Sequence, residues 1–259
     1  EVEKIKDEFS ENIKNFENSK NVEEQCEYFD KIIKLRNYVD TMQTLVSIRH
    51  SIDTTDEFYD KENEYMDEIS PILFSFTNDF YRALVNSKFK KELTQKYGKF
   101  LFEKAENTLK TFSSEVIPDF QEENRLTSKY EKLIASAKIE FDGKELNLSK
   151  MVPYTQSKDR NVRIEAAKKV ANFFSENKEE FDNIYDSLVK VRDKMAKKLG
   201  YKNYVEFGYK RLSRLEYDAK MVAGYRKQVL ENIVPIHTEL RKRQEKRLGV
   251  KKLRFYDEA

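Results

Sequence analysis

Glycine and proline are scarce along this chain, and their scarcity limits the folds that it can adopt. The 259 residues include only six glycines and four prolines. An all-β fold needs many tight reversals, which glycine and proline usually supply. Apolar residues instead recur every three or four positions, as on the buried face of a helix. The sequence therefore predicts an all-α fold, with length enough for one large domain or two ordinary ones.

The first third of the chain predicts an elongated antiparallel helical arm. Apolar positions are periodic over 2–16, and the pair Asn21 and Glu24 has the spacing of a capping box before a second long helix. We expect Asp53 to Thr55 to form the turn and cap before a third helix. Pro71 interrupts that helix, which predicts a kink or a fresh helix start near Ser70.

Shorter helices are expected next, over 88–97, 99–111 and 114–138, with Pro118 in the first turn of the last. The one strand signal is AKIEFDGKELNL, where Asp142-Gly143 lies between short alternating runs. This pattern predicts a small β-hairpin near 138–148 that leans on the helices or pairs with strands from elsewhere. A short helix or turn over 149–156, which contains Pro153, and a helix capped by Ser157 should follow it.

Residues 181–218 form the most informative stretch. Its apolar positions predict a helix of about five turns that ends at Gly200, a C-cap glycine. Asn203 is the expected N-cap of a second short helix, in which Gly208 allows another backbone to approach closely. Asp218 should cap a final long helix through Arg247, kinked at Pro235 and ended by Gly249. Its predicted apolar face consists of Met221, Val222, Tyr225, Val229, Ile233 and Ile236.

Charge and cysteine content exclude several functions. Because 49 basic residues face 47 acidic ones, the chain has no strong field to attract nucleic acid or anionic membrane. The basic run RKRQEKR at 241–247 suits a helix C-terminus better than a phosphate-binding site. A single cysteine fits a reducing compartment, and no apolar run is long enough to span a bilayer. We therefore expect a cytoplasmic protein without nucleic-acid or membrane partners.

No catalytic motif is recognisable. The only histidines, His50 and His237, have no histidine at i+4, and we interpret both as structural or surface residues. Cys26 lies on an apolar helical face, which is typical of a buried, inert thiol. Carboxylate pairs such as Glu122 with Glu123, or Asp186 with Asp193, are too plentiful to single out an acid and a base, and we interpret them as solvated helix faces. Scattered glycines exclude a phosphate-binding loop.

One aromatic and basic cluster is the best candidate for a ligand-facing surface. Aromatic rings and guanidinium groups bind peptide faces and carboxylates well, although core packing and helix capping explain the same residues. The cluster comprises Tyr201, Tyr204, Tyr209, Arg211, Arg214 and Tyr217.

The corner LGYKNY at 199–204 resembles that of the thimet oligopeptidase-like metallopeptidases, in their oligoendopeptidase F branch. Three further blocks carry the resemblance in the same order, namely IRHSIDTTDEFYDKENEYMDEISP (48–71), IASAKIEFDGKELNLS (134–149) and SKDRNVRIEAAKKV (157–170). With LGYKNYVEFGYKRLSR (199–214), they span most of the chain.

The resemblance implies a helical protein whose two lobes enclose a channel that admits short peptides. Zinc is held on the channel floor by the histidines of His-Glu-x-x-His and by a later glutamate, while the motif glutamate activates water. Those residues belong to the second half of a family chain, and none maps onto this sequence. The matching half is the N-terminal one, so we expect catalytic and metal residues to be absent here.

We therefore predict the N-terminal portion of a zinc oligoendopeptidase, truncated, and inactive by itself. Its arm is expected over 1–112, and a channel-wall lobe that belongs to a longer peptidase domain over 113–259. Short peptides and the C-terminal catalytic half are the expected partners. The alternative is a catalytically silent helical scaffold or binding module. An open reading frame that continues into His-Glu-x-x-His favours the first hypothesis, and a stop codon favours the second.

Overall fold

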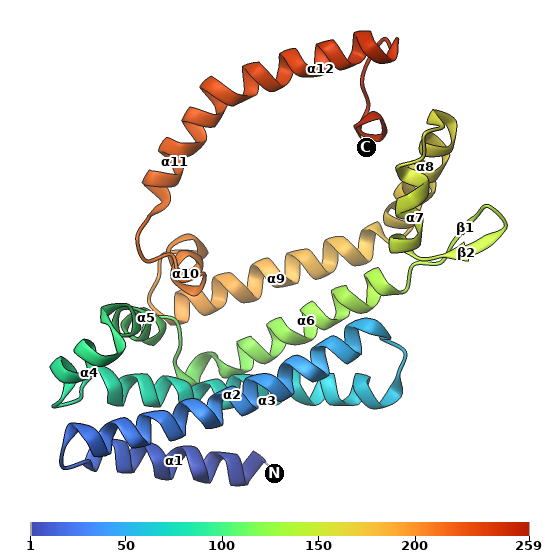
Figure 1. Cartoon of the computed structure of the whole chain (residues 1–259). Helices are drawn as coiled ribbons and strands as arrows, with labels where there is room; N and C mark the ends of the chain where they lie inside the picture. Colours follow the sequence, from blue (N-terminus) through green and yellow to red (C-terminus); the bar gives the residue numbers. More distant parts are fainter. Residues whose placement is uncertain (1, 259) are drawn as a thin grey trace. The chain divides into compact units, whose positions relative to one another are not determined.

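The computed structural model describes residues 2–258, and the all-α prediction is confirmed (Figure 1). One small antiparallel hairpin accompanies the helices. Single turns of 3₁₀ helix cover Ser114–Val116 and Phe255–Asp257. The helices are α1 (Val2–Asn18), α2 (Val22–Ile52), α3 (Glu57–Val85), α4 (Lys90–Tyr97), α5 (Lys99–Leu109), α6 (Ile117–Ala135), α7 (Leu148–Thr155), α8 (Arg160–Glu176), α9 (Lys178–Lys198), α10 (Tyr204–Arg211), α11 (Ala219–Gln228) and α12 (Val234–Leu248).

The chain divides into two compact units. The first holds the residues up to 129 together with 186–215, and the second holds 130–185 together with those from 216 onward. Helix α6 therefore begins in the first unit and ends in the second, whereas α9 runs from the second into the first. The expected division between 112 and 113 stays a prediction.

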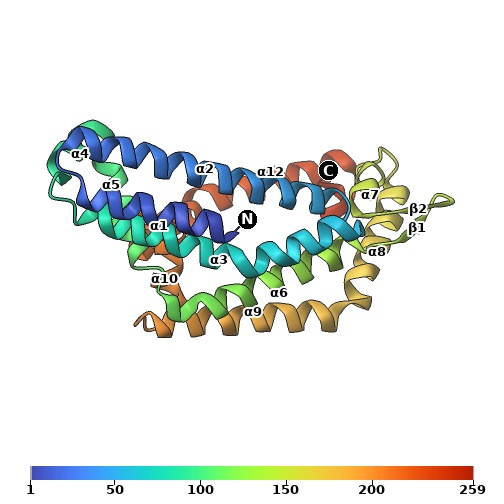
Figure 2. The same cartoon turned by 90° about the horizontal axis from the view of Figure 1, so that it is seen from below.

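The first three helices of the first unit form the predicted antiparallel arm. Helices α1, α2 and α3 pack against one another, with short turns that reverse the chain (Figure 2). The side chain of Asn21 accepts a hydrogen bond from the Glu24 amide at 2.8 Å, and Glu24 accepts one from the Lys20 amide at 2.7 Å. The predicted cap of α2 is therefore confirmed.

The predicted cap of α3 is wrong by one residue. Asp56, and not a residue of 53–55, accepts hydrogen bonds from the amides of Phe58 and Tyr59, at 3.0 and 3.1 Å. Asp53 is the C-cap of α2, and its side chain accepts a hydrogen bond from the Thr55 amide at 2.9 Å. Because Asp53 is engaged within the turn, the next aspartate caps the new helix.

Pro71 does not start a new helix, because α3 continues through it, with a change of direction near its middle (Figure 2). Proline has no amide hydrogen, so the carbonyl of Asp67 loses its donor within the helix. Asn124 of α6 replaces that donor, with its Nδ2 at 3.0 Å from the Asp67 carbonyl oxygen. Gln121 likewise donates to the Glu68 carbonyl at 2.7 Å. Side chains of α6 therefore satisfy the backbone groups around the interruption.

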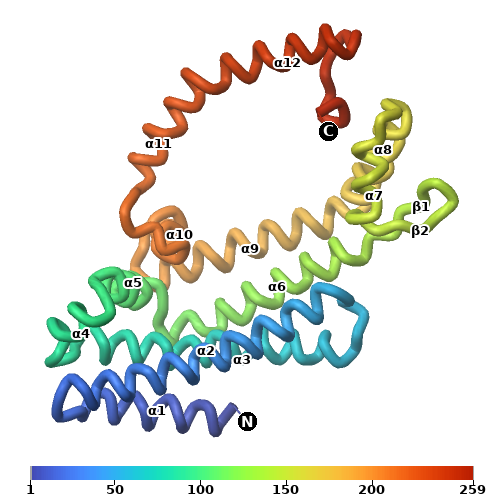
Figure 3. The backbone as a smooth tube through the Cα atoms, in the orientation of Figure 1, coloured from blue at the N-terminus to red at the C-terminus, as the bar shows by residue number. Residues whose placement is uncertain are grey.

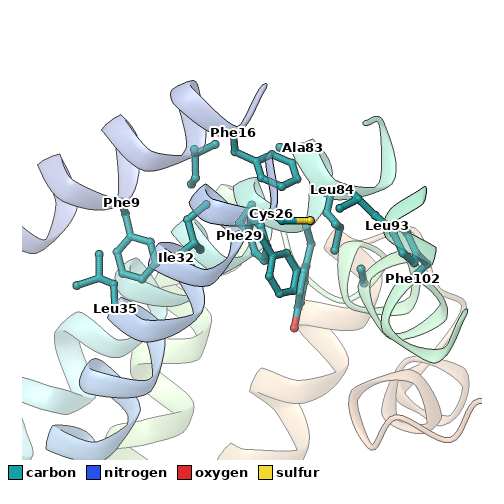
Figure 4. Close-up of a cluster of buried hydrophobic side chains, with 14 of the residues drawn as sticks. Phe9, Phe16, Cys26, Phe29, Ile32, Leu35, Ala83, Leu84, Leu93 and Phe102 are labelled. Atoms are coloured by element: carbon teal, nitrogen blue, oxygen red, sulfur yellow. The ribbon is translucent and has the colours of Figure 1, made fainter. Parts of the chain in front are cut away.

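The core of the first unit lies between the arm, α4 and α5 (Figure 4). The ring of Phe29 stacks on Tyr97 at 4.1 Å and meets Phe80 edge-on at 5.6 Å. Cys26 is buried in the same cluster, in agreement with the prediction of a buried thiol. Burial raises the pKa of the Tyr97 phenol, and its hydrogen bond with Cys26 adds to the rise.

The second unit contains the predicted hairpin, of β1 (Ile139–Phe141) and β2 (Lys144–Leu146). Asp142 and Gly143 have φ of 53° and 67°, as a type I′ turn requires. Ile139 and Leu146 pack into a cluster with Met151 of α7 and with α8. The hairpin thus leans on helices, as a two-stranded sheet must.

Two arginines of α8 hold the C-terminal turn of the second unit. Arg160 donates from Nε and Nη2 to the two carboxylate oxygens of Asp257, at 2.8 and 3.0 Å, and Arg163 Nε donates to the Tyr256 carbonyl at 2.6 Å. The hydrogen bond from Arg160 holds the pKa of Asp257 below its ordinary value. The N-cap of α8 is Asp159, not Ser157 as predicted, because the Ser157 hydroxyl accepts from the Asp159 amide instead.

Helices α11 and α12 are joined through a π-helical turn, Val229–Ile233, into one curved helix (Figure 3). The Asp218 cap and the Gly249 end are confirmed, and Pro235 lies in the first turn of α12. The extra residue of a π turn is what changes the helix direction there. Most of the predicted apolar face is exposed, and Tyr225 is 68% accessible. Among residues 2–258, no helix is long and apolar enough to cross a bilayer.

Candidate functional site

The candidate site is the corner between α9 and α10, which glycine and asparagine shape. Gly200 has φ of 82°, and the following Tyr201 amide donates to the Ala196 carbonyl at 2.9 Å. This left-handed residue ends α9 as its sequence predicts. Asn203 then accepts a hydrogen bond from the Val205 amide at 2.9 Å and begins α10, so both predicted caps are confirmed.

Tyr201 and Tyr204 pack inside this corner on either side of Phe207, which is fully buried. Their rings lie 5.5 and 5.6 Å from that of Phe207. The Tyr201 hydroxyl donates to the Lys110 carbonyl at 2.8 Å. Burial raises the pKa of Tyr201, and the nearby Glu206 carboxylate adds to the rise. Both tyrosines therefore contribute to holding α10 in place.

Gly208 has a different neighbour from the one predicted. A Cβ atom at this position would meet Cε1 of Tyr204 at 3.0 Å, and its three nearest neighbours are all atoms of that ring. The glycine thus leaves room for a tyrosine ring of its own helix.

A buried carboxylate, Glu123 of α6, anchors the far end of α10. Its side chain is 7% exposed. Arg211 reaches the two carboxylate oxygens at 3.1 and 2.9 Å, and Arg192 of α9 reaches one of them at 2.6 Å. Arg211 also lies over the Phe120 ring at 5.0 Å. Because a buried charge is tolerated only when it is paired, these contacts fix α10 and α9 against α6.

A second buried carboxylate on α6 repeats this arrangement one turn earlier. Asp119 is 3% exposed and pairs with Lys194 at 2.7 Å and with Lys198, both of α9. Burial alone would raise the pKa of Asp119, but hydrogen bonds from the two lysines outweigh it and hold the pKa below its ordinary value. Lys194 and Lys198, in the last turns of α9, are therefore ion-pair partners of α6.

Comparisons with known proteins match nearly the whole chain to one family. The model of the peptidase M3 N-terminal domain matches residues 1–112, and that of peptidase family M3 matches 153–259. An oligoendopeptidase F from Bacillus anthracis has a TM-score of 0.97 and 50% identity over 100% of this chain. The chain belongs to peptidase family M3.

Two further solved structures are similar to this chain. PZ peptidase A with an inhibitor gives a TM-score of 0.97 at 50% identity over the whole chain. The oligoendopeptidase F of Enterococcus faecium, at 15% identity and a TM-score of 0.70, shares the fold. No curated protein sequence matches. The chain spans 47% and 46% of the lengths of the first two relatives, so it corresponds to about half of an M3 peptidase chain.

The structure brings together only part of the predicted site of this M3 segment. Tyr204 and Arg211 meet, with 3.4 Å between the hydroxyl oxygen and Nη1, and Arg214 lies 4.6 Å from the centre of the Tyr209 ring. Tyr217 belongs to the second unit, where it is 44% exposed. The role of all six residues in lining a channel stays a prediction.

The sequence did not identify Glu123 as a buried residue, because we interpreted Glu122 and Glu123 together as a solvated helix face. That interpretation holds for Glu122, which is half exposed and pairs with Arg125, and it is wrong for Glu123. One sequence signal was available. Asp119 and Glu123 are like charges at i, i+4, which destabilises an isolated helix. Two carboxylates at this spacing therefore indicate that a neighbouring helix supplies cations to pair with them.

The described part of this M3 segment offers no metal site. His50 is fully buried, and its Nε2 lies 3.1 Å from Asp60 Oδ1, whereas His237 is exposed on α12. Both agree with the structural and surface roles assigned to them. Among residues 2–258 there is no group of three or more His, Cys, Asp or Glu side chains that could hold a metal ion. These residues therefore do not fit the zinc that the family resemblance implies.

Proposed function

We propose that this chain is the N-terminal portion of a zinc-dependent oligoendopeptidase that hydrolyses peptide bonds in short peptides, and that it walls the substrate channel. One observation carries the proposal, namely the match of the whole chain to oligoendopeptidase F at 50% identity. Zinc and the groups that activate water are supplied by the other half of such a protein. We place the protein in the cytoplasm, since it has a single, buried cysteine.

The ion pairs of α6 support a role as a rigid wall. Asp119 and Glu123 hold α9 and α10, while Gln121 and Asn124 hold α3. A wall that limits substrate length must keep its shape as peptides bind, and side chains locked by buried partners meet that need.

The six predicted residues divide into two roles in this proposal. Tyr201, Tyr204 and Arg211 hold the corner, because their polar atoms contact groups of the chain itself. We propose that Arg214, whose guanidinium lies over the Tyr209 ring, binds the peptide together with that ring, and that Tyr217 of the second unit also lines the channel. An arginine binds a peptide carboxylate through two parallel hydrogen bonds, which lysine cannot reproduce. Arg214→Lys should therefore raise KM for a short peptide about tenfold with kcat nearly unchanged.

The exposed face of α11 and α12 has a place in the same proposal. Met221, Tyr225 and Ile236 are each more than half exposed. Apolar side chains that are exposed along one helix face are typical of an interaction site. We propose that the C-terminal catalytic half of the protein covers them.

The test compares the segment with a polypeptide that also carries the other half of a family chain. A quenched fluorogenic peptide of about ten residues, long enough for an endopeptidase to bind on both sides of the bond, reports cleavage. We expect cleavage by the longer protein, its loss with a chelator, its recovery with zinc, and none by the segment. Cleavage that is indifferent to the chelator would refute the metallopeptidase assignment. A longer protein that binds peptides and never cleaves them would favour the silent scaffold.

A further inference from the structure

A cavity of about 530 Å³ lies in the first unit. Its lining residues come from helices α1, α2, α3, α5 and α6 and from the end of α10. Its volume falls within the range of pockets that bind small organic molecules. All of its lining residues belong to the first unit, so the cavity is defined by that unit alone.

The lining of the cavity has excess positive charge. Arg36, Lys104 and Lys210 line it, against a single carboxylate from Asp40. Arg211 also lines it, but its charge is matched by Glu123. Lys210 has only a distant carboxylate, at 3.9 Å on Glu206. Within residues 2–258, neither Arg36 nor Lys104 forms an ion pair. An anion that entered the cavity would meet cations not yet neutralised by the protein.

Arg36 supplies the sharpest sign of a missing ligand. Its Nη1 donates to the Tyr81 hydroxyl at 3.1 Å, while its Nε is buried and has no hydrogen-bond partner within the described chain. A buried donor left unpaired is costly, so such atoms usually have a partner. The edge formed by Nε and Nη2 is the one with which Arg160 holds Asp257 in the second unit. The same edge of Arg36, whose Nε has no partner, suits an oxyanion bound in the cavity.

Aromatic rings also line the cavity. The rings of Phe74 and Phe112 meet edge-on at 5.1 Å, and Phe112 stacks on Phe120 at 5.8 Å. All three line the cavity. An inorganic anion would make no use of these rings, whereas an organic anion with an apolar body could contact both the cations and the rings.

We propose that this cavity binds a small organic carboxylate with an aromatic or aliphatic body. Its carboxylate pairs with Arg36 and Lys104, and its body lies against Phe74, Phe112 and Phe120. The site binds its ligand through charge and shape and does not transform it. Because Asn124 and Arg211 also line the cavity, an occupied site touches the residues that position α3 and α10 against α6.

The test uses two probes that differ only in charge, N-acetylphenylalanine and its amide. Calorimetry on the full chain should show saturable binding of the carboxylate. The neutral amide should bind at least about tenfold more weakly than the acid, as expected for the loss of one charged hydrogen-bonded pair. Acetate and inorganic phosphate, which lack the apolar body, should also bind at least about tenfold more weakly. An amide that binds as tightly as the acid, phosphate that binds as tightly, or no saturable binding of the acid would overturn the proposal.

Three variants locate the site. Arg36→Gln should weaken carboxylate binding about tenfold, and Lys104→Gln about threefold because lysine forms a less directional contact. Lys34→Gln is the matched control, since Lys34 is an exposed cation of the same helix outside the cavity lining. Binding that falls equally in all three would indicate a general charge effect and refute the site. Lys104 is exposed, so its variant remains decisive if Arg36→Gln fails to fold.

Discussion

Replacing Glu123 by glutamine tests whether a buried carboxylate holds the corner in place. The change keeps the volume of the side chain and one oxygen acceptor, and it leaves Arg192 and Arg211 without a counter-charge. Breaking a fully buried ion pair costs about 3–5 kcal/mol. The two arginine side chains are 37% and 25% exposed, so water partly solvates the charges left behind. We therefore expect a loss of about 2 kcal/mol in the free energy of unfolding.

Circular dichroism is the suitable measurement, since the chain has no tryptophan. Unfolding in denaturant should show the loss directly, and the melting temperature should fall by about 5 °C. The control is Glu122→Gln, one residue away, which removes an exposed ion pair with Arg125. It should cost less than about 0.5 kcal/mol. Equal losses for the two variants would refute the argument that burial makes the Glu123 charge important.

Three further changes test other parts of the fold. Folding lowers the pKa values of Asp119 and Asp257, so the stability that these carboxylates contribute is complete above the unfolded pKa and is lost as the pH falls below about 4. Denaturant unfolding should therefore give a lower free energy of unfolding at pH 3 than at pH 6, and the difference should be smaller in Asp257→Asn. Asn124→Leu should cost about 1–2 kcal/mol by leaving the Asp67 carbonyl without a donor. In a Pro71→Ala background Asn124→Leu should cost less, because the alanine amide can donate to the Asp67 carbonyl. Equal costs of Asn124→Leu in the two backgrounds would contradict this account. Gly143→Ala should cost about 1 kcal/mol from its left-handed backbone alone, since nothing lies within 4 Å of the new Cβ; a chain as stable as the original would argue against the type I′ turn.

Local signals in the sequence predicted local structure well. The caps at Asn21, Asn203 and Asp218 are confirmed because each depends on one side chain and an amide two or three residues later. The hairpin turn is confirmed for the same reason, since Asp142 and Gly143 carry the required φ values themselves. The predicted caps at 53–55 and at Ser157 are wrong because an aspartate lies two or three residues later: Asp53 and Ser157 accept from the turn, while Asp56 and Asp159 accept from the helix.

Burial of charge could not be predicted in this way. Glu123 is buried by Arg192, which is 69 residues further along the chain. Periodicity shows which residues share a helix face, but it does not show what covers that face. The same limit applies to α11 and α12, whose apolar face was identified from its spacing and is exposed in the structure.

The polar contacts of α6 fix its register along the neighbouring helices. Apolar packing alone specifies this register only weakly. Apolar contacts are non-directional, so a helix that slides by one turn can still bury a similar area. A slip of α6 by one turn would bring only one of its two carboxylates, Asp119 and Glu123, against cations of α9 and α10, and would leave the other carboxylate and the other cations unpaired. The same slip would separate Asn124 from the Asp67 carbonyl freed by Pro71. Both losses leave buried polar groups without partners, which costs more than the contacts themselves contribute. Directional partners on both neighbours therefore fix one arrangement of α3, α6 and α9, and with it the position of the corner that carries Arg211 and Arg214.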